Sequence, residues 1–294
     1  MRPIKQSKRA EVWYRERLYA VIDEMTNIVI NELESPTLND APTTPPISIT
    51  AKLSRAIQKV ANLSIADIAN RVSFGLVNRA NQQNKAQTQR IYNQAFGIDL
   101  SGLLGDGAIS EDMDKAVKEN VDLITSIQTD FINDIGEKVF TNLSSGGRHE
   151  NLISIIKQRG EVSKARAKFI ARDQTAKLNA ALTESRSRAL GLDLYEWGGT
   201  DDERERDSHY KLNRMLCKYS DPTVYSDDGG KTWKKRKTIG AYEGSPGTDY
   251  QCRCVPLSQK SHAITLNNLG ANNGNRKKSL FRKTLVCRAS CPCW

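Results

Sequence analysis

The stretch RAKFIARDQTAKLNAALTESRSRALGLDLYEW, residues 166–197, decides the fold because the chain changes from helix to strand within it. A helix is predicted from about Ser163 to Leu190, and Gly191 ends it. A shorter helix is predicted before it, over about 150–158. The DLYEW segment at 193–197 is the first predicted strand. This part of the chain therefore mixes helices with short strands.

A hairpin is predicted further on, in the TVYSDDGGKTW segment at 223–233. Asp227, Asp228, Gly229 and Gly230 supply the backbone freedom that its turn needs. The strands on either side are short, so this region is expected to form a small sheet.

Upstream, apolar residues recur at helical spacing over about 8–34, 48–96 and 110–143, which predicts a first half of long helices. Between the first two stretches, SPTLNDAPTTPP at 35–46 holds four of the nine prolines. Because proline fixes φ and removes a backbone donor, this segment is predicted to be a linker or an extended arm.

These patterns predict an α+β fold, in which a half of long helices is followed by a small α+β domain with short strands and by a basic C-terminal tail. The predicted divisions are 1–46 (helix and proline-rich arm), 47–148 (helical region), 149–258 (small α+β domain) and 259–294 (tail).

The net charge of +10 is concentrated at the end of the chain. Residues 255–294 contain seven basic and no acidic residues, which leaves only +3 on the rest. A segment of this kind favours binding to a polyanion such as packaged DNA. The residues predicted to contact DNA are Lys260, Arg276, Lys277, Lys278, Arg282, Lys283 and Arg288. Residues 99–138, by contrast, contain ten acidic residues and three lysines. Such a stretch is either a solvated helix face or a docking surface for a basic partner.

All six cysteines lie in the last third of the chain, which in a reducing cytoplasm favours a metal site or plain thiols over disulfides. Cys252 and Cys254 are two positions apart, so an extended segment presents both thiolates to one side. With His209 and Cys217 they would complete a tetrahedral zinc site. In the alternative, His209 makes a structural hydrogen bond and the cysteines are small buried hydrophobic residues.

A catalytic site is the weaker hypothesis. A metal-dependent nuclease would pair His209 with an acid of the DDERERD segment at 201–207, namely Asp201, Asp202, Glu203 or Asp207. The same segment is also typical of an exposed helix start with internal ion pairs, in which Arg204 and Arg206 contact the neighbouring acids. No Gly-rich phosphate loop is present, so motor activity is not expected and the chain is predicted not to be an enzyme.

No run approaches eighteen apolar residues, and the basic N-terminal segment leads into an amphipathic stretch instead of an apolar signal core. We therefore expect a protein that is made and kept in the cytoplasm, with no membrane partner.

Four motifs in a fixed order, within about residues 150–258, resemble the phage Mu F-like minor head protein family. In that family a helix carrying R-A-x-x-I-A-R-[TD] precedes a G-hydrophobic-x-x-Y-x-W strand, a D-x-R-x-R-x-x-H segment and a closing P-x-x-x-x-x-C-R-C. The matching residues are Arg166, Ala167, Ile170, Ala171, Arg172, Tyr195, Trp197, Asp202, Arg204, Arg206, His209, Pro246, Cys252, Arg253 and Cys254. The family usually has a Leu-Asp-Gly-like turn after the histidine. Here residues 211–214 read KLNR, so this loop is expected to differ.

The resemblance implies a structural minor capsid protein of a tailed phage, attached to the portal inside the head and assisting head assembly, DNA packaging or DNA delivery. It implies the portal protein and packaged DNA as partners, with the major capsid or scaffolding protein as further candidates, and makes 47–148 the portal-facing region. The expected location is the virion, at the portal vertex, after assembly in the host cytoplasm. Some relatives carry a toxin domain after the Cys-Arg-Cys motif, and the residues after Cys254 are too few for one. A DNA-binding module and a metal-dependent nuclease acting on phage DNA stay open as alternatives.

Overall fold

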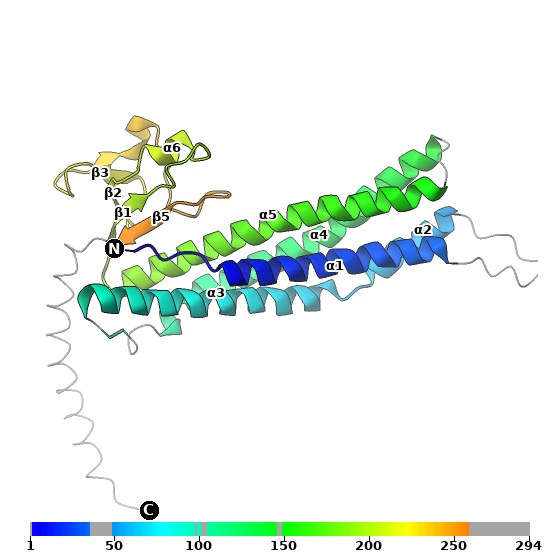
Figure 1. Ribbon diagram of the computed structural model, residues 1–294, viewed down its shortest axis with the longest axis horizontal. Helices are drawn as coiled ribbons and strands as arrows, with labels where there is room; N and C mark the ends of the chain where they lie inside the picture. The colour runs from blue at the N-terminus through cyan, green and yellow to red at the C-terminus, as the bar shows by residue number, and fades with distance from the viewer. Residues whose placement is uncertain (1, 36–48, 98, 101–104, 146–148, 259–294) are drawn as a thin grey trace, which may run out of the picture.

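The computed structural model describes residues 2–35, 49–97, 99–100, 105–145 and 149–258. Long helices lie side by side along the long axis of the molecule, and a small domain of short strands sits at one end (Figure 1). The helices are α1 Lys8–Glu34, α2 Ile49–Ala61, α3 Ile65–Phe96, α4 Ser110–Ser144 and α5 His149–Ala189, with a short 3-10 helix, η1 Asp106–Ile109, before α4. The predicted helical stretches at 8–34 and 110–143 are confirmed, and the stretch at 48–96 is helical but divided into α2 and α3.

Local sequence sets the ends of these helices. The hydroxyl of Ser7 accepts the backbone N–H of Ala10 at 3.1 Å and caps the start of α1. Gly97 ends α3 in the left-handed conformation, with φ of 66°, which glycine adopts at little cost. Between α2 and α3 the helical pattern is interrupted at Asn62 and Ser64, residue types that favour turns because their side chains compete for backbone hydrogen bonds.

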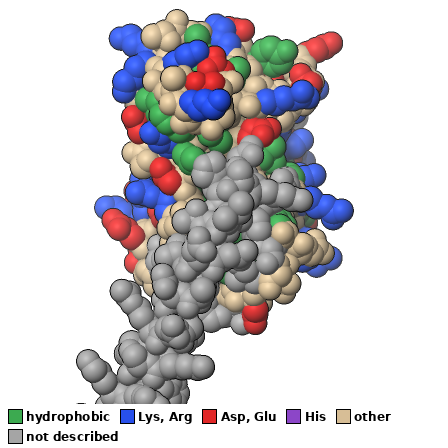
Figure 2. All heavy atoms as spheres, turned by 90° about the vertical axis from the view of Figure 1, so that its left-hand side faces the viewer, with side chains coloured by type: hydrophobic (Ala, Val, Ile, Leu, Met, Phe, Trp, Pro, Cys, Tyr) green, Lys and Arg blue, Asp and Glu red, His purple; other side chains and the backbone are tan. Residues whose placement is uncertain are grey.

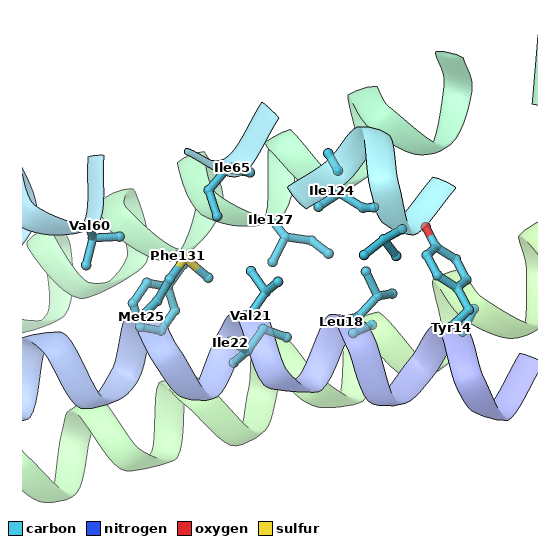
Figure 3. Close-up of a cluster of buried hydrophobic side chains, with 14 of the residues drawn as sticks. Tyr14, Leu18, Val21, Ile22, Met25, Val60, Ile65, Ile124, Ile127 and Phe131 are labelled. Carbon is cyan, nitrogen blue, oxygen red and sulfur yellow. The ribbon is translucent and has the colours of Figure 1, made fainter. Parts of the chain in front are cut away.

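One apolar core joins all five helices. On α1, Leu18, Ile22 and Met25 are at most 1% exposed, and in Figure 3 Val21 of the same helix points toward Ile127 of α4. Full burial of one such side chain contributes about 1.5–3 kcal/mol, so this row alone holds α1 firmly in the bundle.

The break predicted between residues 158 and 163 is wrong, because α5 is continuous from His149 to Ala189. Gly160 lies where α1 approaches α5: a Cβ at this position would be 2.9 Å from Oγ1 of Thr26. The glycine permits close helix packing and does not terminate the helix. Helix α5, which the sequence assigned to the start of the small domain, shares its core with the helices before it.

The small domain contains an antiparallel sheet with the order β4-β3-β2-β1-β5. Its strands are β1 Leu194–Gly198, β2 Leu216–Lys218, β3 Val224–Ser226, β4 Lys234–Lys235 and β5 Val255–Ser258, with α6 Asp207–Tyr210 and the 3-10 helix η2 Arg236–Ile239 between them. The predicted hairpin is formed by β3 and β4, with Val224 opposite Lys235. In its turn the Asp228 carboxylate accepts the backbone N–H groups of Lys231 and Thr232 at 3.0 Å each.

The sheet is held against the end of the helical bundle. Gly191, with φ of 75°, turns the chain from α5 toward β1. Strand β5 pairs with β1, and Oγ of Ser258 in β5 lies 2.9 Å from the hydroxyl of Tyr92 in α3. The predicted α+β class is therefore confirmed. Among the described helices, none has both the length and the apolar character that a membrane-crossing helix needs.

Candidate functional site

Three buried residues with metal-binding side chains meet in the small domain: His209 of α6, and Cys252 and Cys254 just before β5. Their ligand atoms all lie within 4.8 Å of one another. Nδ1 of His209 is 3.5 Å from Sγ of Cys252 and 3.5 Å from Sγ of Cys254. The tertiary fold thus brings together three of the four residues that the sequence predicted as metal ligands.

The carboxylate of Asp249 holds the imidazole ring from its other side. Its Oδ2 lies 3.1 Å from Nε2 of His209 and 3.2 Å from Nη1 of Arg206. Arg206 also donates to the carbonyl oxygen of Tyr250 at 2.7 Å, which fixes the loop. Because a carboxylate can only accept, the proton of a neutral ring resides on Nε2, and Nδ1 turns its lone pair toward the two sulfurs.

Aromatic rings cover this cluster. The fully buried Trp197 of β1 meets His209 edge-on, with ring centroids 5.7 Å apart, and the ring of Tyr242 lies 4.7 Å from that of His209. The buried N–H of Trp197 has no hydrogen-bond partner within the described part of the chain, yet it is close enough to the Cys254 sulfur to influence the pKa of that thiol. The cluster is therefore shielded from water on the sheet side.

The loop that carries the two cysteines is fastened to α5. Gln251 is left-handed, with φ of 53°, and its N–H donates to Asp173 at 2.7 Å. Its side-chain amide donates to the carbonyl oxygen of Phe169 at 2.8 Å. Gly247 has φ of 87°, and a Cβ there would be 3.0 Å from the Cβ of Ala180, so both conformation and space require glycine.

Contacts within the cluster shift the pKa values of its members. The hydrogen bond from the Cys254 thiol lowers the pKa of Cys252, and the same contact, followed by burial, raises the pKa of Cys254. Burial lowers the pKa of His209, but its hydrogen bond to Cys252 and the charges of Cys252 and Asp249 outweigh burial, so the pKa is raised overall. The backbone N–H of Cys254 also donates to Sγ of Cys252 at 3.4 Å. Cys252 is thus the sulfur that holds negative charge more readily.

Cys217, predicted as the fourth ligand, is not brought into this group. It lies in β2, opposite Tyr195 of β1 and Tyr225 of β3. Its Sγ contacts the carbonyl oxygen of Met215 at 3.7 Å, and burial raises its pKa to about 11 although Arg236 acts in the opposite direction. A thiol that burial among aromatic rings keeps neutral behaves as a small hydrophobic residue, and the sequence prediction of a ligand role is corrected accordingly.

Glu205 is a carboxylate beside the cluster that sequence reasoning did not consider as a ligand. Its Oε1 lies 3.6 Å from Sγ of Cys254, and its Oε2 accepts the backbone N–H of Asp201 at 2.7 Å. The signal in the sequence was its position four residues before His209. The chain from 201 to 206 forms turns and not the predicted helix start, with Asp201 at φ of 53°, and this turn carries Glu205 toward the cysteines.

The predicted motif residues form ion pairs elsewhere in the fold. Arg253 binds both carboxylate oxygens of Asp202, and this contact lowers the pKa of Asp202 to about 2. The backbone N–H of Arg204 donates to the same carboxylate at 3.1 Å. Arg166 of α5 pairs with Asp130 of α4. The DDERERD segment thus forms two of its ion pairs with distant residues: Asp202 binds Arg253, and Arg206 binds Asp249.

The acids considered for a nuclease do not gather around His209. Asp207 pairs with Lys211 at 2.7 Å, and the carboxylate that contacts His209 is that of Asp249. The others line a separate, exposed hollow formed by Asp201, Asp202, Glu203, Arg204 and Tyr210. Among the described residues, the geometry thus brings none of the four acids that the nuclease hypothesis named to His209.

A cleft of about 610 Å³ lies between α1, α5 and the small domain, and Cys252 and Cys254 form part of its wall. The acidic residue that lines this cleft, Glu11, forms an ion pair with Lys8 at 2.8 Å. The basic residues that line this junction cleft are Lys5, Lys8, Arg15, Lys168, Arg172 and Arg253. The cleft is therefore electropositive and gives access to the sulfur atoms from outside the sheet.

The predicted DNA-contact residues Lys260, Arg276, Lys277, Lys278, Arg282, Lys283 and Arg288 lie outside the described residues, as do Cys287, Cys291 and Cys293. On the described surface, Figure 2 shows Lys and Arg interspersed with Asp and Glu around the end that carries the small domain. This mixture agrees with the low net charge of the chain before its tail.

Residues 133–257 match the model of the family described as Phage Mu protein F like protein. The match begins inside α4 and continues through α5 and the sheet into β5. The chain is also 32% identical, over 261 residues, to a protein of Haemophilus influenzae described as an uncharacterized protein; the alignment covers 87% of this chain and 54% of that protein. The chain thus spans about half the length of this relative. No solved structure matches the chain.

Proposed function

We propose, from the match of residues 133–257 to the phage Mu protein F-like family, that this chain is a structural minor head protein of a tailed phage. Its role is to bind the portal inside the head and to assist head assembly, DNA packaging or DNA delivery. The family match carries the proposal, because it runs through α5 and the sheet and so extends well beyond the short motifs.

The shape of the helical bundle suits a protein that connects others. Its helices lie side by side along the long axis of the molecule (Figure 1). Phe169 and Tyr250 are 53% and 57% exposed and line one hollow of about 540 Å³ together with Leu123 of α4. Neighbouring aromatic residues that water can reach are typical of partner contacts. We assign the portal contact to this aromatic hollow, with the acidic α4 surface as its charged surroundings.

A structural role needs no catalytic group. Aromatic rings cover the buried His209 cluster on its sheet side, and its histidine contacts a carboxylate that also binds Arg206. Such an arrangement stabilises a fold, and we propose that the chain is not an enzyme.

The proposed location is the virion, inside the head at the portal vertex, reached after assembly in the host cytoplasm. The basic residues of the tail would contact packaged DNA and neutralise its phosphates. Such a contact weakens as the salt concentration rises. The major capsid or scaffolding protein is a further proposed partner.

Cryo-electron microscopy of assembled heads tests the main proposal. The expected result is density at the portal vertex that accommodates the long α1–α5 bundle with the small domain at one end. Heads purified from a phage lacking this chain are the control, and the density must be absent there. A chain located only on the outer capsid surface, or absent from heads, would overturn the proposal.

A DNA-binding module is the second candidate, and the junction cleft favours it, because six basic residues line that cleft within the folded part of the chain. Salt titration of DNA binding separates the two. If binding depends on the tail alone, deletion of residues 260–294 removes all salt-sensitive affinity. Binding that survives the deletion and is lost in Lys168→Glu/Arg172→Glu assigns DNA contact to the junction cleft.

A further inference from the structure

The two nitrogen–sulfur distances in the cluster are those that one tetrahedral ion imposes on its ligands. With zinc–nitrogen bonds of about 2.05 Å and zinc–sulfur bonds of about 2.3 Å, the nitrogen and sulfur ligands of a tetrahedral site lie roughly 3.6 Å apart. Nδ1 of His209 lies 3.5 Å from both Cys252 Sγ and Cys254 Sγ. A hydrogen-bonded Cys–His pair would need only one sulfur at this distance, whereas here two are equidistant.

We propose that His209, Cys252 and Cys254, with Glu205 as the fourth ligand, form a structural zinc site that stabilises the small domain. This inference concerns the folding of the domain and does not depend on the proposed role in the phage head.

Glu205 has the position that the fourth ligand requires. Oxygen and sulfur ligands of a tetrahedral zinc ion are also roughly 3.6 Å apart, and Oε1 of Glu205 is 3.6 Å from Sγ of Cys254. Glu205 does not belong to the group whose ligand atoms all lie within 4.8 Å of one another, so its carboxylate would have to move toward the other ligands to close the site. Cys217 has no such contact, because its sulfur faces the carbonyl of Met215.

The surroundings orient and balance the ligands as they do in zinc proteins. Asp249 accepts from Nε2 of His209, and a carboxylate behind a zinc-bound histidine fixes the ring and its tautomer. The backbone N–H of Cys254 donates to the sulfur of Cys252. The indole N–H of Trp197 is buried near the sulfur of Cys254. Two thiolates and a carboxylate would leave one negative charge on a zinc complex, beside the electropositive junction cleft.

The position of the site explains what the ion does. It joins the 199–209 segment, which follows β1, to the chain that enters β5, and β1 and β5 are neighbours in the sheet. The strands are two to five residues long and their core is small. Small domains with so little apolar core commonly depend on a metal or a disulfide for stability. The junction cleft provides the route by which the ion reaches the sulfurs.

Metal analysis of the full chain tests the proposal directly. Cys287, Cys291 and Cys293 are changed to Ser in every sample, because three terminal cysteines could bind zinc by themselves. We expect one zinc per chain after purification with zinc, and cobalt substitution should give the thiolate charge-transfer and tetrahedral d–d absorption bands. His209→Ala, Cys252→Ser and Cys254→Ser should lose both signals. Cys217→Ser, the matched control, should keep both.

Two conservative variants keep the test valid if the ligand variants do not fold. Asp249→Asn retains all four ligands and should weaken cobalt affinity about 10–100-fold, as loss of an outer carboxylate does in other sites. Glu205→Gln should weaken it at least as much, and an unchanged affinity would overturn the assignment of the fourth ligand. A folded protein that takes up neither zinc nor cobalt, with Cys252 alkylated rapidly by iodoacetamide, would overturn the site and indicate a simple thiolate–imidazolium pair.

Discussion

Gly160 of α5 lies directly against Thr26 of α1, so close that a Cβ on the glycine would be 2.9 Å from the threonine Oγ1. Thr26 cannot easily move away, because its hydroxyl donates to the carbonyl oxygen of Ile22 at 2.7 Å. The two helices therefore approach each other at a point where only a hydrogen atom fits, and this contact sets their spacing.

Gly160→Ala should destabilise the bundle although alanine is the better helix former. Helix propensity favours Ala over Gly by about 1 kcal/mol, but the clash with Thr26 costs about 1–3 kcal/mol as overpacking usually does. Gly136→Ala in α4 is the matched control, since a Cβ there has nothing within 4 Å, and it should raise stability. Urea denaturation measures both. Equal stabilisation by the two substitutions would contradict the close contact.

The Asp202–Arg253 ion pair predicts a pH effect. Hydrogen bonds from Arg253 hold the pKa of Asp202 at about 2, below its ordinary 3.8. A depressed carboxylate pKa stabilises the fold above the unfolded value, and that stabilisation is lost as pH falls from about 4 toward 2. In an NMR titration Arg253→Gln should move the pKa of Asp202 up toward 3.8. Arg166→Gln removes a different ion pair and should leave it unchanged; a shift in that control, or none in Arg253→Gln, refutes the assignment.

Arg236 should be essential to the small domain. It is fully buried, and its guanidinium donates to the carbonyl oxygens of Val224, Tyr242 and Gly244 at 3.0, 3.1 and 2.8 Å. Arg236→Met leaves these acceptors without donors, and each buried unsatisfied group costs about 1–3 kcal/mol. Arg236→Lys should not restore stability, because a single ammonium group cannot reach the three carbonyl oxygens as the planar guanidinium does.

Hydrogen exchange measures this effect locally. In Arg236→Met, amides of β2 and β3 should exchange faster while those of α1 remain protected, since α1 belongs to a separate core. Arg204→Met, at an exposed position, is the control and should exchange like the wild type. Uniform loss of protection in both cores would mean that the two parts unfold together.

The helices could be predicted because their information is local. Apolar side chains such as Leu18 and Ile22 recur at helical spacing, and a pattern of that kind specifies a buried face. Gly160 could not be interpreted in the same way, because a glycine that ends a helix and one that admits a neighbouring helix look identical in sequence. Only the partner, Thr26, distinguishes them.

The His209 cluster could likewise be predicted only where the information is local. Cys252 and Cys254 share a short motif, and their residue type with His209 indicated a common site. The choice between Cys217 and Glu205 depended on strand order and on a left-handed residue at Asp201, neither of which a single sequence reveals. Likewise, Arg206 was predicted to contact the neighbouring acids, whereas its partner Asp249 reaches it across the folded domain.

The aromatic hollow gives the proposed portal contact its own test. Phe169 and Tyr250 are exposed, and aromatic side chains at the centre of an interface commonly contribute 2 kcal/mol or more, about a thirtyfold change in affinity. Phe169→Ala/Tyr250→Ala should therefore weaken binding to the purified portal at least tenfold. The folded state should persist, because Gln251 still holds the loop through Asp173. Phe74→Ala, which removes an equally exposed phenylalanine from α3, should bind like the wild type. If Phe74→Ala abolishes binding and the double variant does not, the portal contacts the opposite part of the bundle and the hollow has another role.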